Sequence, residues 1–214
     1  MIQIIDYGAG NIRSVINALN KLGIESRIVS SAKELKLDCK TIFPGVGAAG
    51  SAMRQLKERG FAKAIPQITA PFLGICLGMQ LLMDFSEENS TECLKIIKGK
   101  VLKFNNTKSI TTVKIPQIGW NKVEQKYSKQ PQTENTRLFK GIADKSYFYF
   151  VNSYYVEADI DSGESQEDQV IGTTNYGINF ISAINKKNFY GVQFHPEKSG
   201  EIGLQILNNF CKLC

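Results

Sequence analysis

The chain of 214 residues lacks the features that mark membrane and secreted proteins. No apolar run approaches the length of a membrane span. The first residues predict a strand, without the basic region and cleavage site of a signal peptide. The five cysteines, at positions 39, 76, 93, 211 and 214, are an odd number and lack the spacing of a disulfide framework. Reduced thiols suit the cytosol, so we expect a cytoplasmic protein.

Arginine is scarce, and the absence of arginine clusters argues against nucleic acid as a partner. Only five arginines occur, so the net charge of +6 comes mostly from lysines spread along the chain. No interleaving of aromatic and basic residues typical of RNA binding accompanies them. Dispersed lysine usually forms a solvated surface, and its charge would assist docking to an acidic face of a protein partner.

Histidine and paired cysteines, two common sources of metal ligands, are almost absent. His195 is the only histidine, and Cys211 and Cys214 form one CxxC at the end of the chain. No other cysteine pair or histidine lies close to that CxxC in sequence. We interpret it as incidental, and we expect neither a metal nor another cofactor.

Alternating strand and helix patterns fill the first half of the chain. An amphipathic helix is predicted at 11–22 and a second at 48–59, where Gly60 supplies the C-cap. Short strands are predicted at 2–6, 26–29, 41–43 and 71–75. This rhythm predicts an α/β fold with a mostly parallel central sheet flanked by helices.

Residues from about 95 to 195 show a different pattern, in which polar turns separate short strand candidates. The candidates lie at 101–104, 111–115, 147–151 and 170–173, and a last strand at 189–194 precedes a helix at 200–213. Polar stretches at 124–135 and 159–168 are predicted to be exposed loops. This half predicts a mixed or antiparallel extension of the sheet. The apolar content of 43% suits a single domain covering residues 1–214.

The segment Gly74-Ile75-Cys76-Leu77-Gly78 fits a cysteine version of the nucleophile elbow, a sharp turn from a strand into a helix. The apolar strand before it and an apolar helix start at 77–83 support this interpretation. A side chain at either glycine would collide across so tight a turn, and a helix N-terminus favours the reactive thiolate. Taken alone, the pentapeptide fits a buried structural cysteine equally well.

The surroundings of His195 favour the catalytic interpretation of Cys76. His195 is predicted at the C-terminal end of a strand, and Glu197 follows two residues later, with a proline restricting the backbone between them. A nucleophile needs a base, and the base needs a third group that fixes its tautomer. The sequence therefore predicts a catalytic triad of Cys76, His195 and Glu197.

The glycine-rich segment at 45–50 has three interpretations. Its spacing matches the dinucleotide fingerprint, but it follows a later strand, and no acidic residue lies at the required distance to bind a ribose. It is not a P-loop, since Ser51 stands where lysine would follow the last glycine. Backbone N–H groups at a glycine-rich strand end suit an oxyanion hole, with the N–H of Leu77 as the second donor.

Together these segments resemble the class I, or triad, glutamine amidotransferases. The resemblance covers nearly the whole chain, and its PGVG and Gly-Trp-Asn segments narrow it to the glutaminase subunits of imidazole glycerol phosphate synthases. The matching segments are 6–11, 44–47, 74–80, 86–88, 119–121, 149–151 and 193–199.

The resemblance implies glutamine hydrolysis through a cysteinyl thioester. Cys76 would attack the side-chain amide, His195 would protonate the departing ammonia, and Glu197 would orient His195. The resemblance also assigns an oxyanion hole at Gly45, Val46, Gly47 and Leu77, which becomes correctly oriented only when a partner is bound. It places the glutamine pocket at Gln80, Glu88, Ser153 and Tyr154. It places the partner interface at Asn11, Trp120 and Lys198.

A glutaminase of this length has no room for a domain that uses the ammonia. Free ammonia would mostly protonate at neutral pH, so an acceptor enzyme must dock and receive it through an enclosed path. The resemblance implies a (β/α)₈-barrel cyclase as the partner in a heterodimer. That cyclase makes imidazole glycerol phosphate and an aminoimidazole carboxamide ribotide in histidine biosynthesis.

Two departures from the family pattern leave other functions open. Gln117 and Asn152 stand where the family commonly has histidine; both can hydrogen-bond, but neither can titrate. One alternative is a paralogous glutaminase that supplies ammonia to a sugar amidotransferase in surface-polysaccharide biosynthesis. A stand-alone cysteine hydrolase or peptidase, and a non-catalytic binding subunit, are the others.

Overall fold

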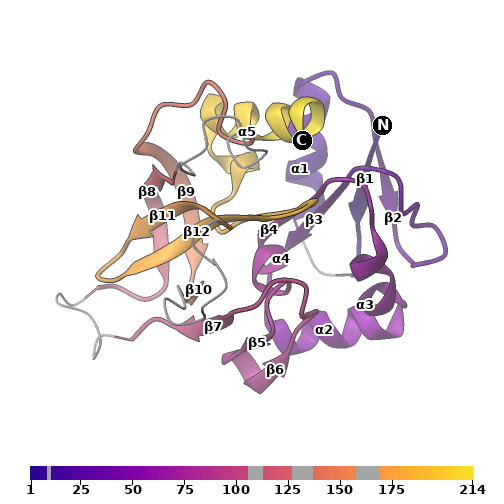
Figure 1. The fold of residues 1–214 in the computed structure, drawn as a ribbon, viewed down its shortest axis with the longest axis horizontal. Helices are drawn as coiled ribbons and strands as arrows, with labels where there is room; N and C mark the ends of the chain where they lie inside the picture. The colour runs from indigo at the N-terminus through magenta and orange to yellow at the C-terminus, as the bar shows by residue number, and fades with distance from the viewer. Residues whose placement is uncertain (9–10, 106–112, 127–136, 158–168) are drawn as a thin grey trace.

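The computed structural model describes residues 1–8, 11–105, 113–126, 137–157 and 169–214 (Figure 1). Its elements in chain order are β1 (Ile2–Ile5), α1 (Ile12–Lys21), β2 (Ser26–Val29), β3 (Thr41–Gly45), α2 (Ala49–Glu58), α3 (Phe61–Ala64), η1 (Ile65–Gln67), β4 (Phe72–Cys76), α4 (Leu77–Gln80), β5 (Phe85–Ser86), η2 (Glu88–Ser90), β6 (Thr91–Glu92), β7 (Lys100–Lys103), β8 (Gln117–Gln125), β9 (Ser146–Asn152), β10 (Tyr154–Val156), β11 (Val170–Asn175), β12 (Asn179–Lys186), β13 (Phe189–Val192), η5 (Pro196–Lys198) and α5 (Gly200–Leu213), where η marks a 3₁₀ helix.

The strands of the described residues form one mixed sheet with a parallel centre. Strands β2, β1, β3, β4 and β13 lie side by side in that order and are all parallel. From β13 onward the sheet continues through β12, β10 and β7, and these pairings are antiparallel. Strands β11, β8 and β9 branch from β12, also antiparallel. The predicted α/β class and the mixed extension are both confirmed.

Helices cover both faces of the parallel centre, and each face has its own hydrophobic core (Figure 1). Helices α1 and α5 pack together on one face, where Leu19 and Phe210 are fully buried. Helices α2 and α3 lie on the other face, with Leu56 and Phe61 fully buried. Strands covered on both faces have no solvated side, which is why the first half of the sequence has short continuous apolar runs.

Most predicted boundaries in the first half are confirmed within one or two residues. Asn11 caps α1, and α2 is followed by Gly60 in the left-handed conformation with φ of 79°. The helix predicted at 77–83 is wrong beyond Gln80. The carbonyl groups of residues 81–83 accept N–H groups from residues 94–97. These tertiary bonds take the place of further helical turns.

The second half departs further from the prediction. Residues 113–115, the described part of the strand predicted at 111–115, lie outside any strand, and β8 begins only at Gln117. Residues 124–125 belong to β8, so the loop predicted at 124–135 starts too early; its remainder beyond 126 and the loop predicted at 159–168 lie outside the described residues. Strands β5, β6, β8, β10 and β12 were not predicted.

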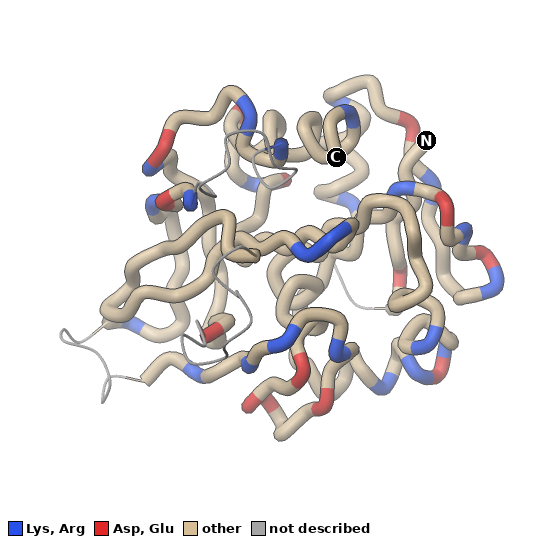
Figure 2. Tube along the Cα trace, in the orientation of Figure 1, with Lys and Arg blue, Asp and Glu red and all other residues tan. Residues whose placement is uncertain are grey.

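Charged residues are dispersed over the surface, as predicted. Figure 2 shows lysine and arginine on elements of both halves of the sheet, interspersed with acidic residues. Within the described ranges, no helix combines the length and the apolar character needed to cross a membrane.

Candidate active site

The nucleophile elbow forms where β4 meets α4. Cys76 is the last residue of β4, and its φ of 54° lies in the left-handed region, which a residue other than glycine adopts only under strain. A Cβ on Gly74 would lie 2.6 Å from the Gly78 carbonyl oxygen. A Cβ on Gly78 would lie 2.0 Å from the Phe43 carbonyl oxygen. Both glycines are therefore required by close backbone contacts, as the sequence predicted.

His195 and Glu197 form a buried pair beside the elbow. The Nδ1 atom of His195 lies 2.8 Å from Oε1 of Glu197, and both side chains are at least nine-tenths buried. The His195 backbone is fixed on two sides: its N–H donates to the Tyr149 carbonyl at 2.9 Å, and its carbonyl accepts from the Ser199 hydroxyl at 2.7 Å. A carboxylate at this distance holds the proton on Nδ1 and leaves Nε2 for chemistry.

The surroundings of His195 favour the imidazolium form. Burial opposes this, since desolvation alone lowers the pKa of a histidine. Hydrogen bonds to Cys76 and Glu197 outweigh burial and raise the pKa of His195 to about 10. At neutral pH the ring therefore carries a proton beside the Cys76 sulfur, which is the arrangement that a general acid needs.

The Cys76 sulfur interacts with hydrogen-bonding groups rather than with a strong helix dipole. Because α4 spans only four residues, its dipole is much smaller than the sequence suggested. The Gln193 side-chain amide donates to Sγ at 3.5 Å, and the thiol lies 3.8 Å from the Val151 carbonyl oxygen as a donor. Gln193 was missed at the sequence level. The strand register explains its position: Val192 of β13 pairs with Ile75 of β4, so Gln193 follows beside Cys76.

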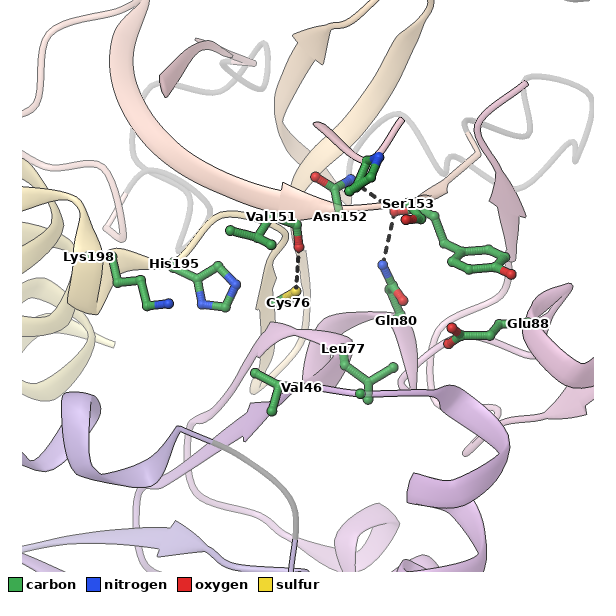
Figure 3. Close-up of a pocket in the computed structure, with 13 residues that line it drawn as sticks. Val46, Cys76, Leu77, Gln80, Glu88, Val151, Asn152, Ser153, His195 and Lys198 are labelled. Carbon is green, nitrogen blue, oxygen red and sulfur yellow. Dashed lines mark hydrogen bonds between the residues drawn. The ribbon is translucent and has the colours of Figure 1, made fainter. Parts of the chain in front are cut away.

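A cavity of about 290 Å³ opens beside Cys76 (Figure 3). His195 and Lys198 lie on one side of the sulfur, and Gln80 and Glu88 lie on the other. The lining residues are Val46, Gly47, Cys76, Leu77, Gln80, Glu88, Pro116, Val151, Asn152, Ser153, Tyr154, His195 and Lys198. The cavity thus brings together most residues of the predicted triad, oxyanion hole and glutamine pocket, from segments far apart in sequence.

The predicted oxyanion segment borders this cavity. Gly45 pairs with Cys76 across β3 and β4, and a Cβ on it would lie 2.6 Å from the Gly78 nitrogen. Val46 and Gly47 line the cavity, and Gly47 has a φ of 96° that favours glycine. The hydroxyl of Tyr7, a fully buried residue, donates to the Val46 carbonyl at 3.4 Å. Oxyanion stabilisation by this segment and by Leu77 stays a prediction.

The predicted glutamine-pocket residues occupy the end of the cavity away from His195. Gln80 donates to the Tyr154 carbonyl at 3.1 Å. Glu88 accepts the N–H of Ala49, the first residue of α2, at 2.7 Å. Burial and the negative charge of Glu88 raise the pKa of the Tyr154 phenol. Ser153 lines the same wall, at the turn between β9 and β10.

Gln117 and Asn152, the two departures from the family pattern, face each other across β8 and β9. Both side chains are buried, and the Asn152 amide donates to the Tyr154 carbonyl at 2.9 Å. In the part of the chain that the structure describes, the Gln117 amide and Oδ1 of Asn152 have no hydrogen-bond partner. One of these two amides without titratable character, Asn152, thus lines the cavity, and the other, Gln117, is paired with it in the sheet.

Of the three predicted interface residues, two converge on one aromatic ring. The exposed Trp120 side chain, 55% accessible, packs edge-on against Tyr149 with ring centroids 6.0 Å apart. The Lys198 ammonium lies 5.9 Å from the centre of the same ring. The Asn11 side chain accepts the N–H of Ser14 at the start of α1. Trp120 is therefore a surface residue, not a core residue.

Cys211 and Cys214 take no part in this site. Both cysteines are half-buried at the end of α5, and neither forms a disulfide. Burial raises the pKa of the Cys211 thiol to about 11, so that thiol stays protonated at neutral pH.

Comparison with known proteins agrees with the resemblance found in the sequence. Residues 3–214 match the family model described as glutamine amidotransferase class-I. A protein of Sulfurimonas denitrificans named imidazole glycerol phosphate synthase subunit HisH is 45% identical, over 99% of this chain and 98% of its own. A protein of Chlorobaculum tepidum with the same name is 46% identical, over 99% of this chain and 100% of its own.

Solved structures share the fold at low sequence identity. One described as a glutamine amidotransferase aligns with a TM-score of 0.69 and 16% identity, covering 98% of both chains. Another, described as PurLQS from Thermotoga maritima, aligns with a TM-score of 0.63 and 20% identity, covering 98% of this chain and 96% of its own. These likenesses concern the fold alone.

Proposed function

Because the chain belongs to the class-I glutamine amidotransferases, we propose that it is the glutaminase subunit of an imidazole glycerol phosphate synthase in histidine biosynthesis. The observation that carries the proposal is the site itself: a cysteine and a histidine that line a cavity of about 290 Å³, with a carboxylate paired to the histidine. The relatives named as that subunit match over nearly their whole length, which supports the assignment of the whole chain as one glutaminase domain.

Glutamine would bind with its side-chain amide at Cys76 and its amino-acid end toward Glu88. The carboxylate of Glu88 suits the α-ammonium group, and Gln80, Ser153 and Tyr154 offer polar groups along the wall. The Cys76 thiolate attacks the amide carbon, and a tetrahedral oxyanion forms. Backbone N–H groups of Leu77 and of the segment 45–47 are the donors available to it.

Collapse of this intermediate releases ammonia and leaves a γ-glutamyl thioester on Cys76. The His195 imidazolium gives its Nε2 proton to the leaving nitrogen, while Glu197 holds Nδ1. Water then attacks the thioester carbon and gives a proton back to His195. Glutamate leaves, and the thiolate is restored beside the imidazolium.

The ammonia acceptor is proposed to be a (β/α)₈-barrel cyclase that docks over Trp120 and Lys198. Two features support this surface. Ile118, Trp120 and Tyr147 are large apolar side chains exposed on neighbouring strands, and Lys198 connects that surface to the cavity lining. Ammonia formed at Cys76 would then pass to the partner without crossing bulk water. Because none of the five cysteines forms a disulfide, the complex is proposed to be cytoplasmic.

One experiment tests both the activity and the acceptor. Glutamate release from glutamine is measured with the chain alone, with the barrel cyclase of the same cell, and with the cyclase plus its nucleotide substrate. The expected result is a slow rate alone and a rise of about a hundredfold or more in the complete mixture.

A Cys76 label controls for the alternatives. If a glutamine-analogue electrophile labels Cys76 but the cyclase gives no stimulation, the acceptor is a different enzyme, and the sugar amidotransferase replaces the cyclase. If neither labelling nor glutamate release occurs, the chain is a non-catalytic subunit. Full activity alone that a Trp120 substitution leaves unchanged would indicate a stand-alone hydrolase.

A further inference from the structure

Buried amide side chains lead from the glutamine pocket to the reacting sulfur. Gln193 is fully buried and Gln80 is nearly so. Gln80 donates to Oε1 of Gln193 at 2.9 Å, and Gln193 donates to Sγ of Cys76 at 3.5 Å. Neither residue belongs to the triad, and Gln193 does not line the cavity. A buried amide costs free energy unless its hydrogen bonds are made. Gln193 uses its side-chain NH₂ for a bond to the reacting sulfur, which suggests a role in the reaction.

A backbone carbonyl fixes which end of each amide faces which neighbour. The Tyr154 carbonyl can only accept, so the Gln80 group 3.1 Å away from it is the NH₂ end. That same NH₂ donates to Gln193, which therefore presents its oxygen to Gln80. The remaining NH₂ of Gln193 faces Sγ. Reversing either amide would set two acceptors or two donors against each other.

We propose that Gln193 is a further catalytic residue, whose amide stabilises the thiolate of Cys76 by donating a neutral hydrogen bond to its sulfur. A hydrogen bond to an ion is stronger than one to the corresponding neutral group, so this donor favours the thiolate over the thiol. It also limits the directions in which the sulfur can move. The inference rests on the proposed function only in taking Cys76 as the nucleophile.

Gln193 differs from His195 in what it contributes to the reaction. The imidazolium loses its proton when ammonia leaves, and it cannot stabilise the thiolate as a cation until the proton returns. An amide does not titrate, so its donor is present at every step. Its position is also secure, because the Gln193 N–H donates to the Ser182 carbonyl at 2.9 Å within the sheet.

The test compares the reactivity of Cys76 in the wild type and in Gln193→Met, which has similar length but no donor. Iodoacetamide alkylation of the Cys76 peptide is followed by mass spectrometry from pH 5 to 10, so that the other cysteines do not interfere. Iodoacetamide needs a thiolate but neither an oxyanion hole nor a partner. The titratable groups around the sulfur and its cavity are Tyr7, Glu88, Tyr154, His195, Glu197 and Lys198, and the variant replaces none of them.

The pH midpoint of alkylation should rise by about one unit in Gln193→Met, and kcat for glutamine in the complex should fall about tenfold with KM changed less than about twofold. Gln193→Glu, with the same shape and a carboxylate at the sulfur, should raise the midpoint further. This second variant keeps the test decisive if the first fails to fold, and thermal melting reports folding for both.

Asn209→Leu is the matched control. Asn209 is another buried amide, which donates to the carbonyls of Leu138 and Lys140 away from the site. The Asn209→Leu variant should be less stable than the wild type, with the same pH midpoint of Cys76 alkylation. A midpoint in folded Gln193→Met that matches the wild type, or a shift equal to that of Asn209→Leu, would overturn the proposal. If the cyclase does not stimulate glutamate release by the wild type, that result would instead contradict the proposed function. The alkylation result would still test the role of Gln193.

Discussion

The two sides of the cavity come from two kinds of sheet. The parallel centre supplies Cys76 at the end of β4, where glycines bring backbone atoms into contact. The antiparallel extension supplies the opposite wall through the end of β9 and the turn into β10. In the centre nearly every side chain is buried, whereas β8 alternates buried and exposed residues. The centre thus fixes Cys76, the proposed nucleophile, and the extension carries the exposed surface proposed for the partner.

This difference indicates which substitutions each side tolerates. At Gly74 and Gly78 in the parallel centre, an added Cβ would meet backbone atoms, which cannot move aside without shifting a strand. At Gly172 in the extension, it would meet side chains, which can change rotamer. We therefore expect the largest losses from changes at the end of β4 and the smallest from changes on the exposed face of β8.

Cys76→Ala should have the largest effect, because it removes the nucleophile while leaving the buried wall of the cavity intact. Glutamate release in the presence of the partner should fall by about 10⁴-fold or more. Cys93→Ala is the control, since burial raises the pKa of the Cys93 thiol to about 12 and leaves little thiolate there. Loss of activity in both variants would contradict the assignment of Cys76.

Gly78→Ala should destabilise the parallel centre of the sheet. The new Cβ would meet the Phe43 carbonyl oxygen at 2.0 Å, so β3 or α4 must shift, at a cost of about 3 kcal/mol in the free energy of unfolding. Gly172→Ala is the matched change in the extension, where the new Cβ would meet a Val123 methyl at 2.9 Å and the cost should be about 1 kcal/mol. Urea denaturation measures both, and equal losses would refute the contrast.

Glu197→Gln should narrow the pH range of activity. Without the carboxylate, the pKa of His195 falls from about 10, so the alkaline loss of kcat should begin at lower pH. At pH 9 the rate should fall about thirtyfold, with a smaller loss at pH 7. A pH profile of kcat that keeps its wild-type shape would contradict the role of Glu197.

The same pKa shift gives the sign of a stability change. A raised pKa means that His195 stabilises the folded state fully below its ordinary value of 6.5 and that this contribution is lost as pH rises through about 10. The difference in unfolding free energy between wild type and Glu197→Gln should therefore be largest at acidic pH and shrink toward pH 10. Urea midpoints measured across that range check this.

Trp120→Ala should have the smallest effect on the isolated chain. With the side chain 55% exposed, its removal should change the free energy of unfolding by less than about 0.5 kcal/mol. The stimulation of glutamate release by the cyclase should nevertheless fall about tenfold, since large aromatic residues dominate interfaces. Ile28→Ala, an exposed residue of β2 on the far edge of the sheet, is the control and should leave stimulation unchanged.

The sequence predicted the parallel centre well because each strand is a short apolar run between clear turn and cap signals. The proximity of Cys76, His195 and Glu197 was also predictable, since a lone histidine at a strand end and a cysteine between two glycines are local signals. The helix at 77–83 was overestimated because the bonds that end it come from residues 94–97, which no local pattern reveals.

The extension was harder to predict because its strands depend on one another. β10 has only three residues and exists by pairing with β7 and β12. The role of Gln193 depends on the register of β13 beside β4, since a shift of one residue would point its amide to the other face. Such roles become visible only when the strand order is known.

The strand order has a consequence for how the protein is made. β13, the last strand of the chain, fills a place between β4 and β12 in the middle of the sheet. During synthesis β4 therefore lacks its neighbour, and Cys76 lacks its histidine, until nearly all of the chain has left the ribosome. An unfinished chain carries Cys76 without His195 and Gln193, the two groups proposed to favour its thiolate. The step that completes the centre of the sheet is also the step that brings the proposed catalytic residues together.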